Sequence, residues 1–133
     1  MEDSSQDLPL KQSGEEGPAE PERSRNRTPL FKLSAVLPEF AAEARRVLIT
    51  WGETALANQV DDLWIYDRCR CGGKECATVD TSEVDPWKAG HQTIGGRFTE
   101  TGFLVVDTFD ERIVCIEMLW YPEFVKALTE LLP

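Results

Sequence analysis

Residues 103–120 read F-L-V-V-D-T-F-D-E-R-I-V-C-I-E-M-L-W, two apolar runs separated by Asp110-Glu111. A two-residue connection between such runs predicts a β-hairpin of Gly102 to Phe109 with Arg112 to Trp120. Asp-Glu is not the Asn-Gly or Asp-Gly pair that these turns prefer, so the turn type stays open. The second run is apolar on both alternating faces, which predicts a central strand. One face would carry Val114, Ile116, Met118 and Trp120, and the other Ile113, Cys115, Glu117 and Leu119.

Two more strands are expected upstream of this hairpin. Residues 63–70 are rich in β-forming side chains, and residues 75–81 form their return partner across the turn Cys71-Gly72-Gly73-Lys74. Residues 82–100 contain Asp85-Pro86, Gly90 and Gly95-Gly96, which is typical of a long loop or a frayed strand. The sequence therefore predicts an antiparallel sheet of about four strands.

Helices are predicted on both sides of the strands. Pro38 suits the first turn of a helix that ends before Gly52, and its apolar residues recur every three or four positions. A second, shorter helix is expected from Glu53 or Thr54 to about Asp62, and Pro122 opens a last helix that runs to Leu132. This order of elements predicts an α+β domain, in which two N-terminal helices and one C-terminal helix cover one face of the sheet.

The chain divides by composition. Residues 1–29 hold four apolar side chains and no aromatic one, so they cannot bury enough surface to offset the entropy of ordering. We expect this stretch to be a disordered acidic arm and residues 30–133 to form a single domain.

Net charge and hydropathy limit the partners and the location. The formal charge is −10, which opposes binding to nucleic acid or to an anionic membrane. The acidic start lacks the apolar run of a signal peptide, and no stretch approaches the roughly 20 apolar residues of a membrane span. We therefore expect a cytoplasmic protein.

Three of the four cysteines, Cys69, Cys71 and Cys76, have the spacing C-x-C-x4-C around Gly72-Gly73. Cysteines in the cytoplasm more often bind metal, act in redox chemistry or pack in a core than form disulfides. Tetrahedral zinc needs four ligands, so Cys115 or His91 would have to supply the fourth.

Strand geometry argues against this zinc site. The Cα atoms of Cys69 and Cys71 would lie roughly 6.5–7 Å apart in a strand, whereas sulfurs that share zinc lie roughly 3.7–3.8 Å apart. Buried structural cysteines are therefore favoured over zinc. A redox role comes third, because it rests only on Arg68, Arg70 and Lys74, whose charges would lower nearby thiol pKa values. No cofactor is favoured, and zinc is the possible one.

Two other residues are candidates for function. His91 is the only histidine, and with Cys76 and an acid such as Asp80 or Asp85 it could form a nucleophilic set. A surface histidine between glycine-containing segments is the favoured interpretation. Trp87 follows Asp85-Pro86 and would be a binding anchor if it is exposed.

Two resemblances accompany these motifs. The octapeptide C-R-C-G-G-K-E-C is similar to the zinc-binding post-SET motif of histone methyltransferases, which borrows a fourth cysteine from the catalytic domain. The rest of that enzyme class is not recognised in the chain. The runs W-I-Y-D-R-C-R-C-G-G-K-E-C-A-T-V, G-F-L-V-V-D-T-F-D-E-R-I-V-C-I-E-M-L and P-E-F-V-K-A-L resemble small bacterial proteins without assigned function. That second resemblance covers residues 37–132 and implies a fold and a bacterial cytosolic setting, but no activity.

The functional hypothesis is an acidic domain that acts without catalysis, by binding another protein. A zinc-binding domain built on Cys69, Cys71 and Cys76 is the alternative, and a thiol redox protein is the third. The oligomeric state does not follow from the sequence.

Overall fold

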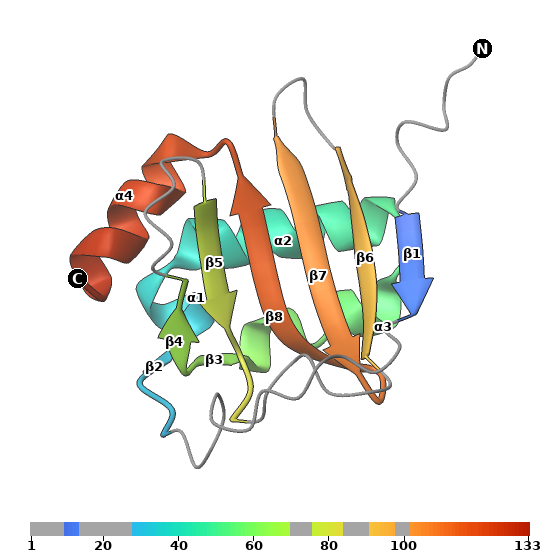
Figure 1. Cartoon of the computed structure of the whole chain (residues 1–133), viewed down its shortest axis with the longest axis horizontal. Helices are drawn as coiled ribbons and strands as arrows, with labels where there is room; N and C mark the ends of the chain where they lie inside the picture. Colours follow the sequence, from blue (N-terminus) through green and yellow to red (C-terminus); the bar gives the residue numbers. More distant parts are fainter. Residues whose placement is uncertain (1–9, 14–27, 70–75, 84–90, 98–101) are drawn as a thin grey trace.

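The computed structural model describes residues 10–13, 28–69, 76–83, 91–97 and 102–133. It is an α+β fold in which an antiparallel sheet carries helices on one face (Figure 1). The predicted fold class is thus confirmed, with a C-terminal helix in the expected place. Among the described residues, no helix combines the length and the apolar character that crossing a membrane requires.

The helical layer begins with a short turn, α1 (Leu33–Val36), and continues in α2 (Pro38–Thr50). Pro38 occupies the first turn of α2 as predicted, and Gly52 takes a φ of 81° just beyond its end. The second predicted helix is shorter than expected. It consists of α3 (Thr54–Ala57) and, after two residues, the 3-10 helix η2 (Val60–Asp62).

The main sheet has six strands in the order β1-β6-β7-β8-β5-β4, two more than predicted. Its strands are β1 (Leu10–Ser13), β4 (Asp67–Arg68), β5 (Cys76–Asp80), β6 (His91–Arg97), β7 (Phe103–Phe109) and β8 (Arg112–Leu119). The hairpin β7–β8 forms as predicted, and β8 is a central strand between β7 and β5. The last helix is α4 (Pro122–Leu131).

Three expectations about the strands need correction. The stretch expected as one strand over residues 63–70 splits at Tyr66. Its first part, β3 (Trp64–Ile65), pairs with β2 (Phe31–Lys32) in a separate two-stranded sheet, and only β4 pairs with β5. Residues 82–100, expected to be a long loop or a frayed strand, contain β6, which pairs along its full length with β7. Residues 10–13, inside the arm expected to be disordered, form β1 against β6.

Two irregularities shape the central hairpin. Asp110 and Glu111 both have positive φ, 56° and 66°, which is the backbone of a type I′ turn. Farther along, Asp107 pairs with Cys115 but Thr108 pairs with Ile113, so Val114 is an extra residue in β8. This bulge returns Ile113 to the helix-facing core, whereas a regular strand would place it on the same face as Cys115.

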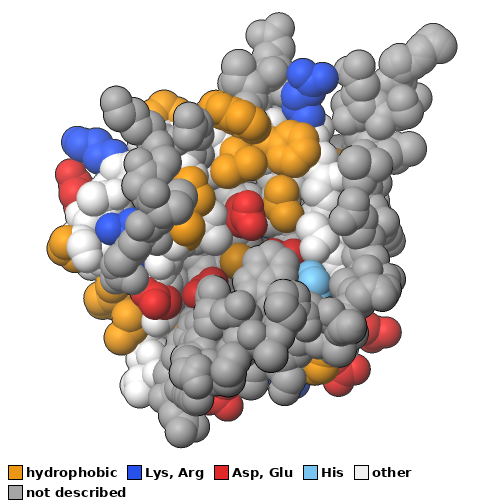
Figure 2. All heavy atoms as spheres, viewed as in Figure 1, with side chains coloured by type: hydrophobic (Ala, Val, Ile, Leu, Met, Phe, Trp, Pro, Cys, Tyr) orange, Lys and Arg blue, Asp and Glu red, His pale blue; other side chains and the backbone are white. Residues whose placement is uncertain are grey.

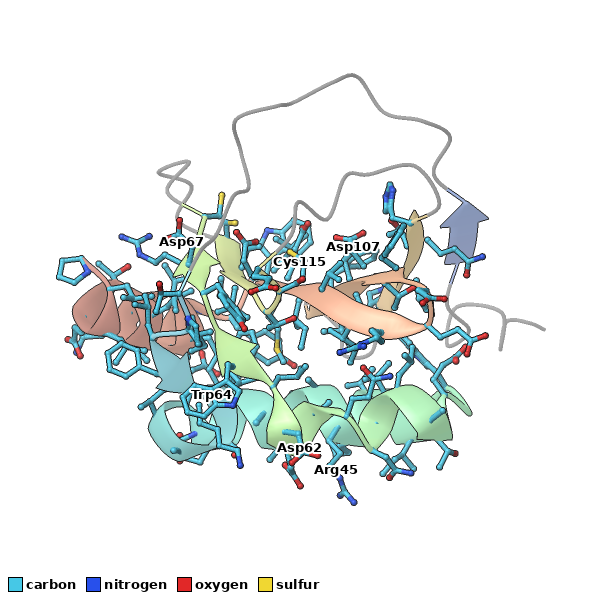
Figure 3. All side chains as sticks on the ribbon, turned by 90° about the horizontal axis from the view of Figure 1, so that it is seen from below. Arg45, Asp62, Trp64, Asp67, Asp107 and Cys115 are labelled. Carbon is cyan, nitrogen blue, oxygen red and sulfur yellow. The ribbon has the colours of Figure 1, made fainter. Side chains whose placement is uncertain are left out.

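The core lies between the sheet and the helices. Fully buried side chains of α2 and α1 pack on those of the central strands; they include Leu33, Phe40, Val47, Leu48, Val79, Leu104, Val106, Ile116 and Met118. Helix α4 adds Phe124, whose ring lies 5.3 Å from that of Phe40. The helices therefore cover one face, and the opposite face of the sheet, which we call the outer face, carries a different set of side chains (Figure 3).

Candidate functional site

A row of polar side chains crosses the outer face of the sheet. The strand register places Asp67, Asp80, Cys115, Asp107 and Thr93 directly opposite one another on β4, β5, β8, β7 and β6. Figure 3 shows Asp67, Cys115 and Asp107 on the side of the sheet away from α2. In Figure 2, which views this face, acidic side chains lie among apolar ones. We call Asp80, Asp107, Cys115 and Glu117 the outer-face cluster.

Asp107 is the most buried acid of this cluster, with 1% of its surface exposed. One carboxylate oxygen, Oδ1, accepts a 2.6 Å hydrogen bond from the hydroxyl of Thr93. The other oxygen, Oδ2, is buried and has no hydrogen-bond partner among the residues that the structure describes. Burial raises the pKa of Asp107, and the opposing effects of Thr93 and His91 only partly offset it. A buried carboxylate with an unused acceptor is a costly arrangement for a fold to keep.

The two cluster residues on β8, Cys115 and Glu117, also have raised pKa values. Burial raises the pKa of the Cys115 thiol well above its ordinary value, and the neighbouring carboxylates of Asp80, Asp107 and Glu117 add to the effect. Burial also raises the pKa of Glu117, helped by the charges of Asp107 and Asp80. Cys115 is thus a protonated, poorly nucleophilic thiol, which does not suit a redox role for this residue.

The arrangement of potential metal ligands differs from the predicted set. In the described part of the chain, one group of three or more such residues has its ligand atoms within 4.8 Å of one another: Asp107, Cys115 and Glu117. Cys115 was a predicted fourth ligand, but Cys69, Cys76 and His91 do not belong to this group.

Register explains why Cys115 and Cys76 are apart. Cys115 pairs with Asp80, and Cys76 pairs with Leu119, so they are offset by four residues, or about 13 Å along the strands. Cys69 and Cys76 are half-buried and lie near the β4 edge of the sheet. The Cys76 sulfur lies 3.0 Å from the hydroxyl oxygen of Thr78. Cys71 and Trp87 lie outside the described residues, so the zinc site at Cys69–Cys76 and the Trp87 anchor stay predictions.

His91 begins β6 and pairs with Phe109, two residues from the pair of Thr93 with Asp107. Its charge lowers the pKa of Asp107, so it lies near the outer-face cluster. The structure therefore places this half-buried histidine at the margin of an acidic cluster.

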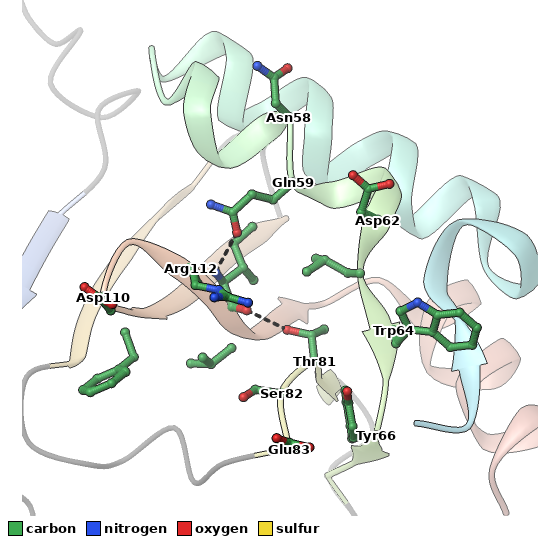
Figure 4. A pocket seen from close by; sticks show the side chains of 14 residues that line it. Asn58, Gln59, Asp62, Trp64, Tyr66, Thr81, Ser82, Glu83, Asp110 and Arg112 are labelled. Carbon is green, nitrogen blue, oxygen red and sulfur yellow. Dashed lines mark hydrogen bonds between the residues drawn. The ribbon is translucent and has the colours of Figure 1, made fainter. Parts of the chain in front are cut away.

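A second feature is a groove of about 840 Å3 at one end of the sheet (Figure 4). It lies between η2 with β3 on one side and the ends of β5, β7 and β8 on the other. Its described lining residues come from three separate parts of the chain: Asn58, Gln59, Asp62, Leu63, Trp64, Tyr66, Thr81, Ser82, Glu83, Phe109, Asp110, Arg112, Ile113 and Val114.

Hydrogen bonds fix the floor of this groove. The hydroxyl of Thr81 donates to the carbonyl oxygen of Ile113 at 3.2 Å, and the backbone N–H of Ile113 donates to Oε1 of Gln59 at 2.9 Å. Gln59 also donates through Nε2 to the carbonyl oxygen of Glu111 at 2.8 Å. The helical layer, β5 and the hairpin are therefore joined at one point, which gives the groove a rigid base.

The charged and aromatic residues of the groove lie toward solvent. Trp64 is 44% exposed, and Tyr66 is half-buried beside it. Three exposed carboxylates, Asp62, Glu83 and Asp110, line the groove together with one exposed guanidinium, Arg112. A concave surface with aromatic side chains and an excess of carboxylates can bind a cationic group.

Sequence reasoning named Cys115 as a possible metal ligand but missed the carboxylates around it, and it missed the groove. Asp107 lay inside an apolar run, and Trp64 was assigned only to a strand. The one available signal was the placing of an acid in the middle of each buried hairpin strand, at Asp107 and Glu117.

Comparison of this chain with protein-family models, with curated proteins and with solved structures found no match. The resemblance to small bacterial proteins therefore stays a prediction.

Proposed function

We propose that this domain is a non-catalytic binding module that holds a Lys- or Arg-containing segment of a partner protein in the groove of Figure 4. The observation that carries the proposal is an exposed Trp64 beside Tyr66, at a groove lined by Asp62, Glu83 and Asp110. Trp and Tyr are the residue types that most often dominate the energetics of protein interfaces.

The charge of the groove supports a basic partner. The chain carries a formal charge of −10, and among the described residues that line the groove three carboxylates face one guanidinium. A cationic side chain could approach the ring of Trp64 or Tyr66 while its charge is near a carboxylate, and both interactions favour it over an acidic group. Because these carboxylates are exposed, we expect them to affect the rate of association and its salt dependence strongly.

The size of the groove supports a short segment. Its volume of about 840 Å3 falls within the range of pockets that enclose a ligand of a few side chains. Its floor is held by the hydrogen bonds of Gln59 and Thr81, so it needs little reorganisation to bind.

The test uses defined peptides and the full chain. A labelled ten-residue peptide with alternating Lys and Gly is titrated with the protein, and a peptide with Glu in place of Lys serves as the comparison. We expect the basic peptide alone to bind, with an affinity that falls as salt is added. Trp64→Ala and Asp110→Asn should each weaken binding by about tenfold, a typical effect for an interface residue of this kind.

A matched control is Trp120→Ala. Trp120 is also exposed, at 50%, but it contacts Phe103 and does not line this groove. Equal loss of binding in the Trp64 and Trp120 variants would contradict the proposal, as would equal binding of the acidic peptide.

A further inference from the structure

The outer-face cluster contains the donor atoms of a metal site. Cys115 on β8 lies between Asp107 on β7 and Asp80 on β5, and Glu117 follows two residues later on the same face. The sulfur of Cys115 and carboxylate oxygens of Asp107 and Glu117 lie within 4.8 Å of one another. Ligands that share a tetrahedral zinc ion are roughly 3.3–3.8 Å apart, so small side-chain rotations would bring these atoms to binding distance.

The unpartnered oxygen of Asp107 is an independent observation. Only 1% of Asp107 is exposed, Thr93 donates to Oδ1, and Oδ2 finds no hydrogen-bond donor among the described residues. In the described part of the chain, neither Asp107 nor Glu117 forms an ion pair. A cation bound to Oδ2 would neutralise a buried charge and supply the missing partner.

We propose that Asp107, Cys115 and Glu117 bind one divalent transition-metal ion of the zinc class on the outer face of the sheet. The sulfur ligand selects this class over magnesium and calcium, which are bound by oxygen alone. Three protein ligands leave a fourth position for water or for another ligand. This site is separate from the groove and differs from the predicted set of Cys69, Cys71 and Cys76.

Binding requires that the thiol lose its proton. As the bond between Cys115 Sγ and the metal forms, the S–H bond breaks and one proton leaves. The carboxylate of Asp80, the residue opposite Cys115 in the β5–β8 pair, can accept it.

Cobalt(II) provides a direct test, because a thiolate bound to cobalt gives a charge-transfer absorption band in the near ultraviolet. The chelator-treated full chain is titrated with Co2+ alone and then with Zn2+. We expect the band to saturate at one Co2+ per chain and to disappear when Zn2+ displaces it. Cys115→Ser should abolish the band and weaken binding by more than about 100-fold, since even outer-shell partners are worth 10–100-fold in affinity.

Two further variants keep the test decisive if Cys115→Ser does not fold. Asp107→Asn and Glu117→Gln should each weaken Co2+ binding at least tenfold while circular dichroism shows a folded chain. The double variant Cys69→Ser/Cys76→Ser is the matched control and should bind Co2+ with an unchanged band. The proposal is overturned if the wild-type chain gives no band. It is also overturned if the band survives Cys115→Ser but is lost in the control, because the cysteines at 69–76 would then be the ligands.

Discussion

The hydroxyl of Tyr121 donates a 2.9 Å hydrogen bond to Oε2 of Glu43, which joins the start of α4 to the middle of α2. The same carboxylate accepts two hydrogen bonds from the Arg46 guanidinium, at 3.1 and 2.8 Å. Arg46 and, less strongly, Tyr121 favour the charged form and lower the pKa of Glu43 below its ordinary value of 4.5, although partial burial opposes them. The C-terminal helix is thus attached to the helical layer through an ionised side chain.

This attachment predicts a pH-dependent stability. Because the pKa of Glu43 is lower in the folded chain, its contribution is fully present above pH 4.5 and is lost as the pH falls through the folded value. Glu43→Gln should therefore lower the melting temperature near neutral pH, and the difference from wild type should shrink in more acidic buffer. Glu39→Gln, an exposed position of the same helix, is the control. A difference that persists well below pH 4.5 would contradict this explanation.

The hydrogen bonds of Gln59 predict that this one side chain contributes substantially to the free energy of unfolding. Its amide pairs with the N–H of Ile113 and with the carbonyl oxygen of Glu111, so Gln59→Ala leaves both backbone groups without that partner. We expect a loss of about 1–3 kcal/mol in the free energy of unfolding, measured with urea. Asn58→Ala, at the exposed neighbouring position, should change it by less than about 0.5 kcal/mol. Equal losses in the two variants would rule out this role of Gln59.

The hairpin turn predicts a stabilising substitution. Glu111 has a φ of 66°, a conformation that glycine adopts without steric cost. Glu111→Gly should raise the free energy of unfolding by about 0.5–1 kcal/mol, measured by thermal and urea unfolding. The same substitution at Glu123, in the first turn of α4, removes the same charge but should destabilise the chain by a similar amount. Destabilisation by Glu111→Gly would contradict the assigned turn.

The burial of Asp107 predicts that Asp107→Asn stabilises the metal-free chain, although the same substitution should weaken metal binding. In metal-free protein, Asp107→Asn removes a buried charge and keeps the acceptor for Thr93, so we expect a gain of about 1 kcal/mol in unfolding free energy. Measurements in a chelator isolate this effect. Thr93→Val is the opposite control, because it removes the donor to Oδ1 and should destabilise the chain. A less stable Asp107→Asn variant would mean that the carboxylate has a structural role.

The periodicity of apolar residues in the sequence was sufficient to predict the elements with the most regular patterns. The apolar stripe of α2, the hairpin of β7 with β8 and the helix after Pro122 are local patterns, and all three are confirmed. The sequence predicted a long loop or a frayed strand where the regular strand β6 lies, because glycine usually weakens a strand. At Gly95 a Cβ atom would lie 3.2 Å from Cγ2 of Val105, so the glycine permits close packing inside the sheet.

The candidate site could not be found in the same way. Asp80, Cys115 and Asp107 become neighbours only through the pairing of β5 with β8 and of β8 with β7. The first of these pairings joins two strands that are separated in the sequence by β6 and β7. Residue spacing within one segment carries no signal for it, and the bulge at Val114 shifts the alternation of β8 as well. The groove likewise depends on contacts between distant segments.

The strand order has a consequence for synthesis of the chain on the ribosome. The central strands β7 and β8 are the last to be made, whereas the edge strands β1 and β4 come earlier. The apolar face of α2 therefore has only unjoined parts of the sheet to cover it until β8, which links β7 to β5, leaves the exit tunnel. We expect nascent chains that end before residue 120 to remain sensitive to protease and to be retained by chaperones, and the domain to fold as one unit when its C-terminus is released.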